Sequence, residues 1–357
     1  MPGDSSPDTT VAAPTVVPPA TAPDPVPPPG TLVAAEPIDA PEGARAWRVV
    51  HATDGVRGPT VATGMVVVPD REPPPGGWPV VAWAHPTRGL ADACAPSLTD
   101  GVASLPLLEE LLDEGWAVVA ADYEGLGSPG LHPYLVGSSE GRSVLDAIRA
   151  APGVDGAGLE PGAPTALLGF SQGGHAALFA AEAAPVDAPD LDLVGVAVAA
   201  PVSDVGGLVR RFSADPDQVG VVAAVVAGLD AASPDADPAL VLTPDAVALL
   251  PQADIDCIDG FRQRFAGPPA DTIRIPLADD PTWAALLDAQ LAGTTDPGIP
   301  VLVVQGDADE TVAPAETAAL VERLATAGAD VTSVVVPGGH GVDVSAEVLP
   351  WLRDRLP

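Results

Sequence analysis

The 357-residue chain carries 49 acidic and 15 basic side chains, which gives a formal net charge of −34. Apolar residues make up 47% of the sequence, which excludes an acidic disordered protein and provides enough material for a hydrophobic core. Every basic residue is arginine, and so few cations argue against nucleic acid or an anionic membrane surface as a partner.

The N-terminal segment has a composition of its own. Ten prolines occur within residues 1–30, mixed with Ala, Thr, Val and Asp. Such a segment favours extended polyproline II conformations, and we predict a disordered tail there. It contains no basic stretch followed by an apolar one, so we expect no signal peptide within it. The tail fits an exported protein whose signal has been removed, and an ordinary linker is the alternative.

Short apolar runs separated by helical stretches follow from about residue 31. Apolar runs of this kind are typical of strands that are buried on both faces. Their alternation with helices predicts an α/β fold, a mostly parallel sheet with helices on both faces. The expected strands are Val61–Val68, Val80–Ala84, Ala117–Ala121, Ala166–Gly169, Val194–Ala199, Val301–Val304 and Val331–Val336, and the expected helices are Leu105–Asp113, Ser139–Ala150, Gln172–Ala184 and Ala315–Ala327.

The alternation stops between about Pro201 and Asp296, where only helical runs separated by Pro and Asp are found. We interpret this stretch as an insertion, because the strands that follow it could not complete a sheet alone. The predicted division is a core over residues 31–202 and 293–357 and a helical cap over 203–292, with two independent domains as the alternative. The runs are Val205–Phe212, Pro216–Asp230, Pro244–Leu250, Ile255–Phe265 and Pro281–Leu291. The most apolar stretches, Leu193–Val202 and Val219–Leu229, are too short to span a membrane, so we expect no stable membrane insertion.

A Gly-x-Ser-x-Gly pattern lies at one strand–helix junction. It covers residues 169–173, with Ser171 at its centre, and connects an apolar strand to a helical run. In this context the pattern indicates a nucleophile elbow, a tight turn that exposes a serine hydroxyl at the carboxyl edge of the sheet. The flanking glycines are needed because a Cβ there would collide with neighbouring backbone. A glycine-rich junction with an incidental serine is the alternative.

A nucleophilic serine needs a base, and the chain offers five histidines. In this architecture the chain order is serine, acid, histidine. His340 follows the last predicted strand in a glycine-rich loop and is the predicted base. The remaining histidines are assigned to packing or surface positions, to the nucleophile helix, or to loops that precede the serine: His51, His85, His132 and His175.

The acid is expected after the penultimate strand. Gly306, Asp309 and Val312 follow the recurring spacing of a glycine, a carboxylate three residues later and a valine three beyond. Asp309 is therefore the predicted acid. Asp307 is expected to shape the turn, and Glu310 is a third candidate.

The developing oxyanion needs two hydrogen-bond donors. The backbone N–H of Gln172, directly after the nucleophile, is one. The second is expected in the loop after Val80–Ala84. Pro86 lacks an N–H, so Thr87 is the predicted donor, with a loop-capping role as the alternative.

Both cysteines, Cys94 and Cys257, lie in polar, loop-like surroundings. A disulfide that closes a long loop is favoured there, and it requires an oxidising compartment. Buried or reduced free thiols are the alternative.

Five segments together resemble the secretory lipase family, α/β-hydrolases that include fungal lipase A enzymes and actinobacterial esterases. They are AHPTRG at 84–89, DACAPS at 92–97, ADYEGLGSPGLHPYLVG at 121–137, GFSQGGH at 169–175 and GDADETV at 306–312.

The resemblance implies a secreted or cell-surface serine hydrolase of neutral carboxylic esters, with triacylglycerol as the favoured substrate. It implies a triad of Ser171, Asp309 and His340, a cap over the site, and a disulfide between Cys94 and Cys257. No metal or cofactor is expected. A peptidase or acyltransferase on the same fold is the main alternative, and a non-catalytic surface-binding protein is another.

Overall fold

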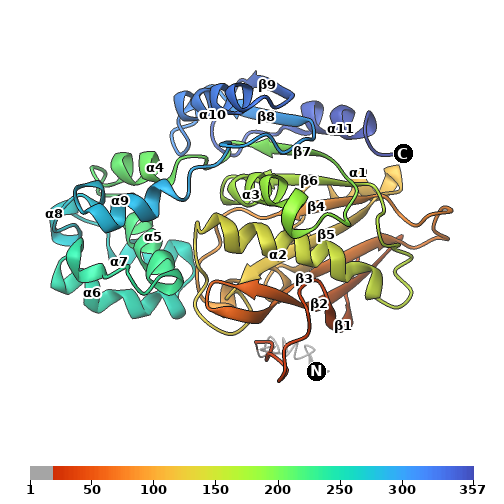
Figure 1. Cartoon of the computed structure of the whole chain (residues 1–357), viewed down its shortest axis with the longest axis horizontal. Helices are drawn as coiled ribbons and strands as arrows, with labels where there is room; N and C mark the ends of the chain where they lie inside the picture. The colour runs from red at the N-terminus through yellow and green to blue at the C-terminus, as the bar shows by residue number, and fades with distance from the viewer. Residues whose placement is uncertain (1–18) are drawn as a thin grey trace, which may run out of the picture.

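The structure of the chain, a computed structural model, describes residues 19–357 (Figure 1). In this part of the chain a nine-stranded sheet has the order β1-β2-β3-β5-β4-β6-β7-β8-β9. In this order, neighbouring strands from β1 to β5 are antiparallel. Neighbouring strands from β5 through β4 to β9 are parallel. The strands are β1 Leu32–Ile38, β2 Ala44–Gly55, β3 Gly58–Pro69, β4 Val80–Ala84, β5 Ala117–Glu124, β6 Thr165–Phe170, β7 Leu193–Ala199, β8 Val301–Gly306 and β9 Val331–Val336.

All predicted strands are present, and two further strands precede them. The central strand β4 is buried along its whole length, as its continuous apolar sequence predicts. In the unpredicted strand β2, Arg45, Arg48 and His51 interrupt the apolar residues, and β1 is an exposed edge strand that contains Glu36 and Pro37. Their pattern carries the weaker signal of strands that face solvent on one side.

Helices cover both faces of the sheet. On one face, α2 Gly137–Ala150, α3 Gln172–Asp187 and α10 Pro314–Ala327 share one apolar cluster with the strands. On the other face, α1 Leu108–Glu114 and α11 Ser345–Arg353 share another. The sequence did not predict α11 because Pro350 lies in its interior, where proline normally interrupts a helix. The arrangement confirms the predicted α/β-hydrolase fold.

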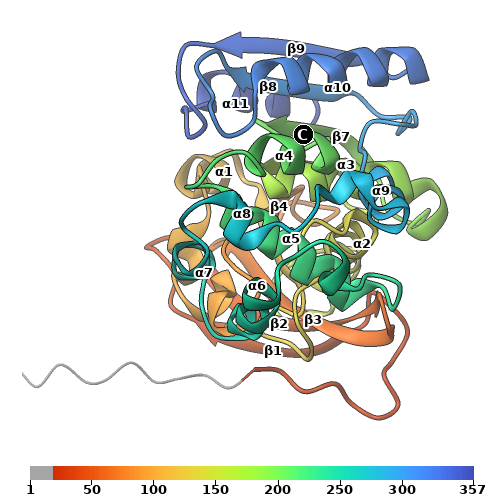
Figure 2. The same cartoon turned by 90° about the vertical axis from the view of Figure 1, so that its left-hand side faces the viewer.

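Between β7 and β8 the chain forms a series of helices and adds no strand to the sheet. In Figure 1 these green-to-cyan helices lie to the left of the sheet, and Figure 2 views them from that side. They have an apolar cluster of their own, centred on helix α5, which is apolar except for Asp230 near its end. The helices are α4 Val205–Phe212, α5 Val219–Ala232, α6 Pro244–Leu249, α7 Ile258–Arg264, α8 Pro269–Thr272 and α9 Pro281–Asp288.

Residues 19–30 lie against the core although they form no helix or strand. Backbone hydrogen bonds run from Ala20 N–H to the Gly127 carbonyl oxygen, 2.8 Å, and from Gly30 N–H to the Ala52 carbonyl oxygen, 2.9 Å. This stretch therefore belongs to the folded chain rather than to a disordered tail, because proline does not prevent its other residues from bonding to a neighbouring surface. The rest of the tail predicted over 1–30 lies outside the described residues. Within residues 19–357, no helix is both long and apolar enough to cross a membrane.

Candidate active site

Ser171 stands in a sharp turn between β6 and α3. Its backbone has φ 56° and ψ −117°, a conformation that L-residues rarely adopt. The turn is possible because glycines surround it. A Cβ on Gly173 would overlap the carbonyl oxygen of Ala84, and one on Gly169 would overlap the carbonyl oxygen of Gly173. The glycines of the pattern thus let the start of α3 press directly against the end of β4.

The side chains of Ser171, His340 and Asp309 form a continuous hydrogen-bonded chain. Ser171 Oγ lies 3.0 Å from His340 Nε2, and His340 Nδ1 lies 2.8 Å from Asp309 Oδ2. Three separate loops supply these groups, after β6, β9 and β8, and all lie at the carboxyl edge of the parallel strands. The geometry is that of a nucleophile, a base within reach of its proton, and an acid that orients the base.

Asp309 is fully enclosed and its carboxylate has four donors. Oδ1 accepts the backbone N–H groups of Thr311 at 2.8 Å and Val312 at 2.9 Å. Oδ2 accepts the Gln305 side-chain amide at 3.1 Å as well as His340. These four hydrogen bonds fix the carboxylate in place, so that it holds the imidazole in one orientation.

The other acidic candidates lie outside this chain of hydrogen bonds. Asp307 is exposed, and its Oδ1 accepts the Gly338 backbone N–H at 2.9 Å. Glu310 is also exposed, and its backbone carbonyl accepts a hydrogen bond from Arg211. Only Asp309 of the three touches the histidine.

The two predicted oxyanion donors come from neighbouring strands. Ala84 and Gly169 are paired in the parallel register of β4 and β6, so the loop with Thr87 lies beside the elbow with Gln172. Neither the Thr87 nor the Gln172 backbone N–H has a hydrogen-bond partner among residues 19–357. The Thr87 hydroxyl lies 3.0 Å from the hydroxyl of buried Tyr134, and burial raises the pKa of that phenol.

The Gln172 side chain is fixed by a buried polar cluster that the sequence analysis missed. Its Nε2 donates to Glu140 Oε1 at 2.7 Å and to His132 Nε2 at 2.9 Å. Glu140 Oε2 bonds to His175 Nδ1 at 2.9 Å, and His175 Nε2 lies 3.2 Å from the Gln290 carbonyl oxygen. We call these five residues the elbow cluster. It joins the nucleophile helix to α2 and to the segment after α9.

Charges in the elbow cluster follow from its hydrogen bonds. Burial lowers the pKa of His132 to about 4, so its ring is neutral at pH 7. Because His132 Nδ1 donates to the Glu124 carbonyl oxygen at 2.8 Å, its Nε2 is free to accept from Gln172. Burial would raise the pKa of Glu140, but the side-chain hydrogen bonds from His175 and Gln172 stabilise its carboxylate and lower the pKa overall. A sequence signal existed: Gln172 and His175 are three residues apart on one helix, and so they share a face.

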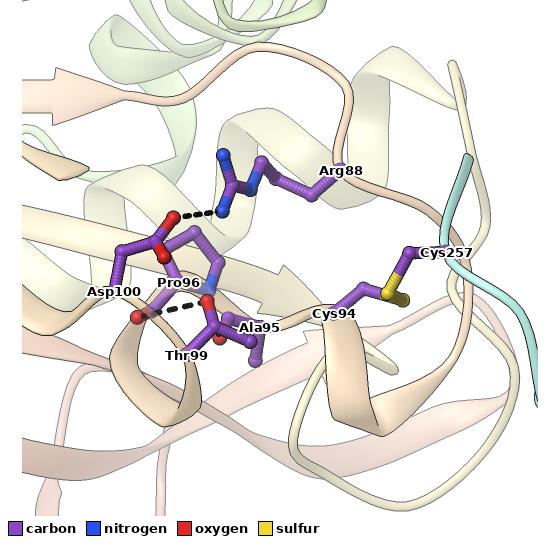
Figure 3. The surroundings of a disulfide bond; sticks show 7 residues. All are labelled: Arg88, Cys94, Ala95, Pro96, Thr99, Asp100 and Cys257. Atoms are coloured by element: carbon purple, nitrogen blue, oxygen red, sulfur yellow. Dashed lines mark hydrogen bonds and ion pairs between the residues drawn. A yellow bond between two sulfur atoms is a disulfide. The ribbon is translucent and has the colours of Figure 1, made fainter. Parts of the chain in front are cut away.

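The predicted disulfide between Cys94 and Cys257 is confirmed, and it joins the helical insertion to the core (Figure 3). Cys257 immediately precedes α7, and Gly89 pairs with it in an isolated β-bridge. Ile258 N–H donates to the Arg88 carbonyl oxygen at 2.9 Å. A Cβ on Gly89 would stand 2.8 Å from Cys94 Sγ, so glycine is required there. The disulfide therefore lies directly against the loop that carries Thr87.

Replacing both cysteines with alanine should lower the free energy of unfolding by about 2–5 kcal/mol, because the bridged residues are 163 positions apart. Chemical denaturation of the double variant measures the loss. Reduced wild-type protein should lose a similar amount, whereas a reducing agent should leave the double variant unchanged. Equal stability of all three forms would contradict a stabilising role for the disulfide.

The sheet order, the helices on both faces and the strained turn at Ser171 define an α/β-hydrolase. A family model described as Secretory lipase matches residues 99–357. The chain belongs to this family, which confirms the resemblance drawn from the five sequence segments.

Known proteins are similar to the chain over most of its length. A protein named as a probable inactive lipase, from Mycobacterium tuberculosis, is 30% identical over 92% of this chain and 78% of its own. Lipase A of Arthroderma benhamiae is 29% identical over 71% of this chain, and the match spans little more than half, 56%, of that protein. Among solved structures, lipase A of Candida antarctica superposes with a TM-score of 0.76 at 20% identity, covering 91% of this chain and 80% of that one. This last similarity supports the fold.

Proposed function

We propose that the protein is a serine hydrolase of neutral carboxylic esters, with acylglycerols as its principal substrates. The observation that carries the proposal is the hydrogen-bonded chain from Ser171 Oγ through His340 to Asp309 Oδ2. Its membership of the secretory lipase family supports ester hydrolysis in particular.

In the first half of the reaction, Ser171 Oγ attacks the ester carbonyl carbon while His340 Nε2 accepts the hydroxyl proton. The carbonyl oxygen becomes an oxyanion, and the N–H groups of Gln172 and Thr87 donate to it. Tyr134, kept protonated by burial, donates to the Thr87 hydroxyl oxygen, and this leaves the Thr87 O–H free as a third donor. The carbon–oxygen bond to the alcohol then breaks, and the alcohol leaves with the proton from His340.

In the second half, water attacks the acyl group on Ser171 and gives its proton to His340. The oxyanion forms again at the same donors. When the bond to Ser171 Oγ breaks, the serine regains its proton from His340 and the carboxylic acid departs. Asp309 Oδ2 accepts the hydrogen bond from His340 Nδ1 in both halves and so keeps the proton on that nitrogen.

We propose further that residues 203–292 form a cap over this site, on the core built from 31–202 and 293–357. The apolar cluster of the insertion includes Val312, which follows Asp309 by three residues, and Tyr134, which bonds to Thr87. The insertion is therefore packed against both the acid loop and the neighbourhood of the oxyanion donors.

The experiment is turnover of p-nitrophenyl butyrate and tributyrin, combined with labelling by diethyl p-nitrophenyl phosphate. We expect hydrolysis of both esters, and a single phosphoryl adduct that mass spectrometry assigns to Ser171. A matched aminoacyl p-nitroanilide tests the peptidase alternative and should be a poor substrate. If Ser171 is labelled but no ester is hydrolysed, the proposed hydrolase activity is wrong. The protein would then resemble the mycobacterial relative, which is named as a probable inactive lipase.

We propose that the protein is exported. The disulfide between Cys94 and Cys257 supports this, because such bonds persist in oxidising compartments, and so does the secretory family. Recovery of the chain from the growth medium of its native host tests the proposal; confinement to the reducing cytosol would contradict it.

A further inference from the structure

A cavity of about 300 Å³ lies beside the candidate active site, on the face of the sheet that α1 and α11 cover. It is bounded by the ends of three neighbouring strands, β4, β6 and β7, and by the loops around them. Its walls include Trp83, Pro86, Leu168, Phe170, Val344 and Val348. The volume lies near the lower end of the range in which proteins bind small organic molecules, about 300–1,000 Å³.

The cavity is next to the histidine of the triad. Phe170 directly precedes Ser171, and its ring centroid lies 4.8 Å from that of His340. Gly341, directly after His340, also lines the cavity. In ester cleavage the departing alcohol must take a proton from His340, so the alcohol part of the ester lies on this side of Ser171.

We propose that this cavity binds the alcohol part of the substrate, and that it selects esters of aromatic or branched apolar alcohols. The inference rests on the proposed ester hydrolysis. A dry apolar cavity of about 150 Å³ holds a benzene ring, so this one has room for a larger group, such as a naphthyl ring.

The polar groups at the cavity refine the class of alcohol. Trp83 lines it and is only 7% exposed, and its indole N–H has no hydrogen-bond partner among the described residues. That N–H is itself covered by protein atoms, so it does not reach the cavity and adds no polar contact for a ligand. Asp343 at the cavity is exposed and ionised at neutral pH, since the Ser345 N–H lowers its pKa, and it disfavours anionic alcohols.

Ser104 offers a matched pair of variants. It lines the cavity, and its hydroxyl donates to the Gly101 carbonyl oxygen at 2.7 Å. Ser104→Phe fills the cavity, and Ser104→Ala loses the same hydrogen bond without filling it. With 2-naphthyl acetate, we expect kcat/KM to fall about tenfold or more in Ser104→Phe and to stay within about twofold of wild type in Ser104→Ala. Ethyl acetate, which does not need the cavity, should be cleaved equally by all three proteins.

An acyl series separates the two ends of the ester. Ethyl octanoate carries a long acyl chain on a small alcohol, and Ser104→Phe should cleave it as fast as wild type does. Loss of ethyl octanoate turnover with 2-naphthyl acetate unaffected would assign the cavity to the acyl chain and overturn the proposal. Unchanged turnover of every ester in Ser104→Phe would overturn it as well.

Binding of the product alcohol tests the cavity without turnover. Titration calorimetry with 2-naphthol should detect binding to wild type and to Ser104→Ala but at least about tenfold weaker binding to Ser104→Phe. If no ester is hydrolysed, the proposed function is wrong, but this titration still shows whether the cavity binds an aromatic alcohol. Absence of binding to wild type, or equal binding to all three proteins, would contradict the assignment.

Discussion

Ser171→Ala is expected to lower kcat/KM for p-nitrophenyl butyrate by about 10⁴-fold or more, because the proposed nucleophile is removed while its surroundings remain. The thermal midpoint should stay close to that of wild type. Alanine keeps the Cβ, and within residues 19–357 the lost hydroxyl has one hydrogen-bond partner, His340. Initial rates and thermal unfolding of the purified variant measure the two quantities. Near wild-type turnover would overturn the assignment of Ser171.

Ser171→Gly is the matched variant that separates chemistry from backbone strain. It should be as inactive as Ser171→Ala, since both lack the hydroxyl. The φ of 56° at this position is costly for residues with a Cβ but not for glycine. We therefore expect a gain of about 1 kcal/mol in the free energy of unfolding over Ser171→Ala, after the entropy cost of glycine in the unfolded chain. Lower stability of the glycine variant would show that the elbow is not strained.

Asp309→Asn is expected to lower kcat by about 10⁴-fold, the size of effect seen when an acid that orients a catalytic histidine loses its charge. All four groups around this carboxylate are donors, so an amide NH₂ placed among them would face at least one donor. With its oxygen toward the backbone, the amide NH₂ faces His340 Nδ1 and favours the wrong tautomer of the ring. With its oxygen toward His340, the NH₂ instead faces the N–H groups of Thr311 and Val312, and the charge that stabilises the protonated imidazole is lost. The KM for small esters should change little, because Asp309 contacts the His340 ring at Nδ1, on the side away from Ser171.

Asp307→Asn is the control for this prediction. Asp307 is two residues away on the same loop. Among the described residues its side chain has one hydrogen bond, from Gly338 N–H, which the asparagine oxygen can still accept. Its kcat should remain within about threefold of wild type, in keeping with the small effects of exposed substitutions. Comparable losses in the two variants would point to the loop as a whole rather than to the Asp309 carboxylate.

Much of the fold was predictable because parallel strands are buried on both faces. The predicted runs within β4 to β8 are short and apolar, so that each could be recognised by itself, whereas β9 is a partly exposed edge strand that contains Thr332 and Ser333. Strands β1 and β2 could not, since their pattern depends on which face meets the core, and that face is set by pairing with β3. The helix α11 was missed because Pro350 argues locally against helix, whereas packing of Trp351 and Leu352 into the core outweighs that preference.

The candidate triad was predictable for a different reason. A strand–turn–helix with glycines at fixed spacing identifies Ser171 as the nucleophile. The chain order serine, acid, histidine then limits which residues can be the acid and the base. Contacts between side chains far apart in sequence carry no such pattern. Glu140 belongs to no motif and lies in the first turn of a predicted helix, yet it is fully buried and contacts Gln172 and His175. Such a role follows from packing α2 against α3, which periodicity alone does not specify.

The elbow cluster also constrains how chimeras of this fold can be made. Gln290 enters the core at the end of the insertion, where its side-chain oxygen accepts Gly137 N–H at 3.0 Å and its backbone oxygen faces His175. A segment transplanted from a relative in place of 203–292 would have to bring a glutamine to this position. Without it, an amide at the start of α2 would lose its acceptor, and the graft would weaken the support behind Gln172 even if its own helices folded well.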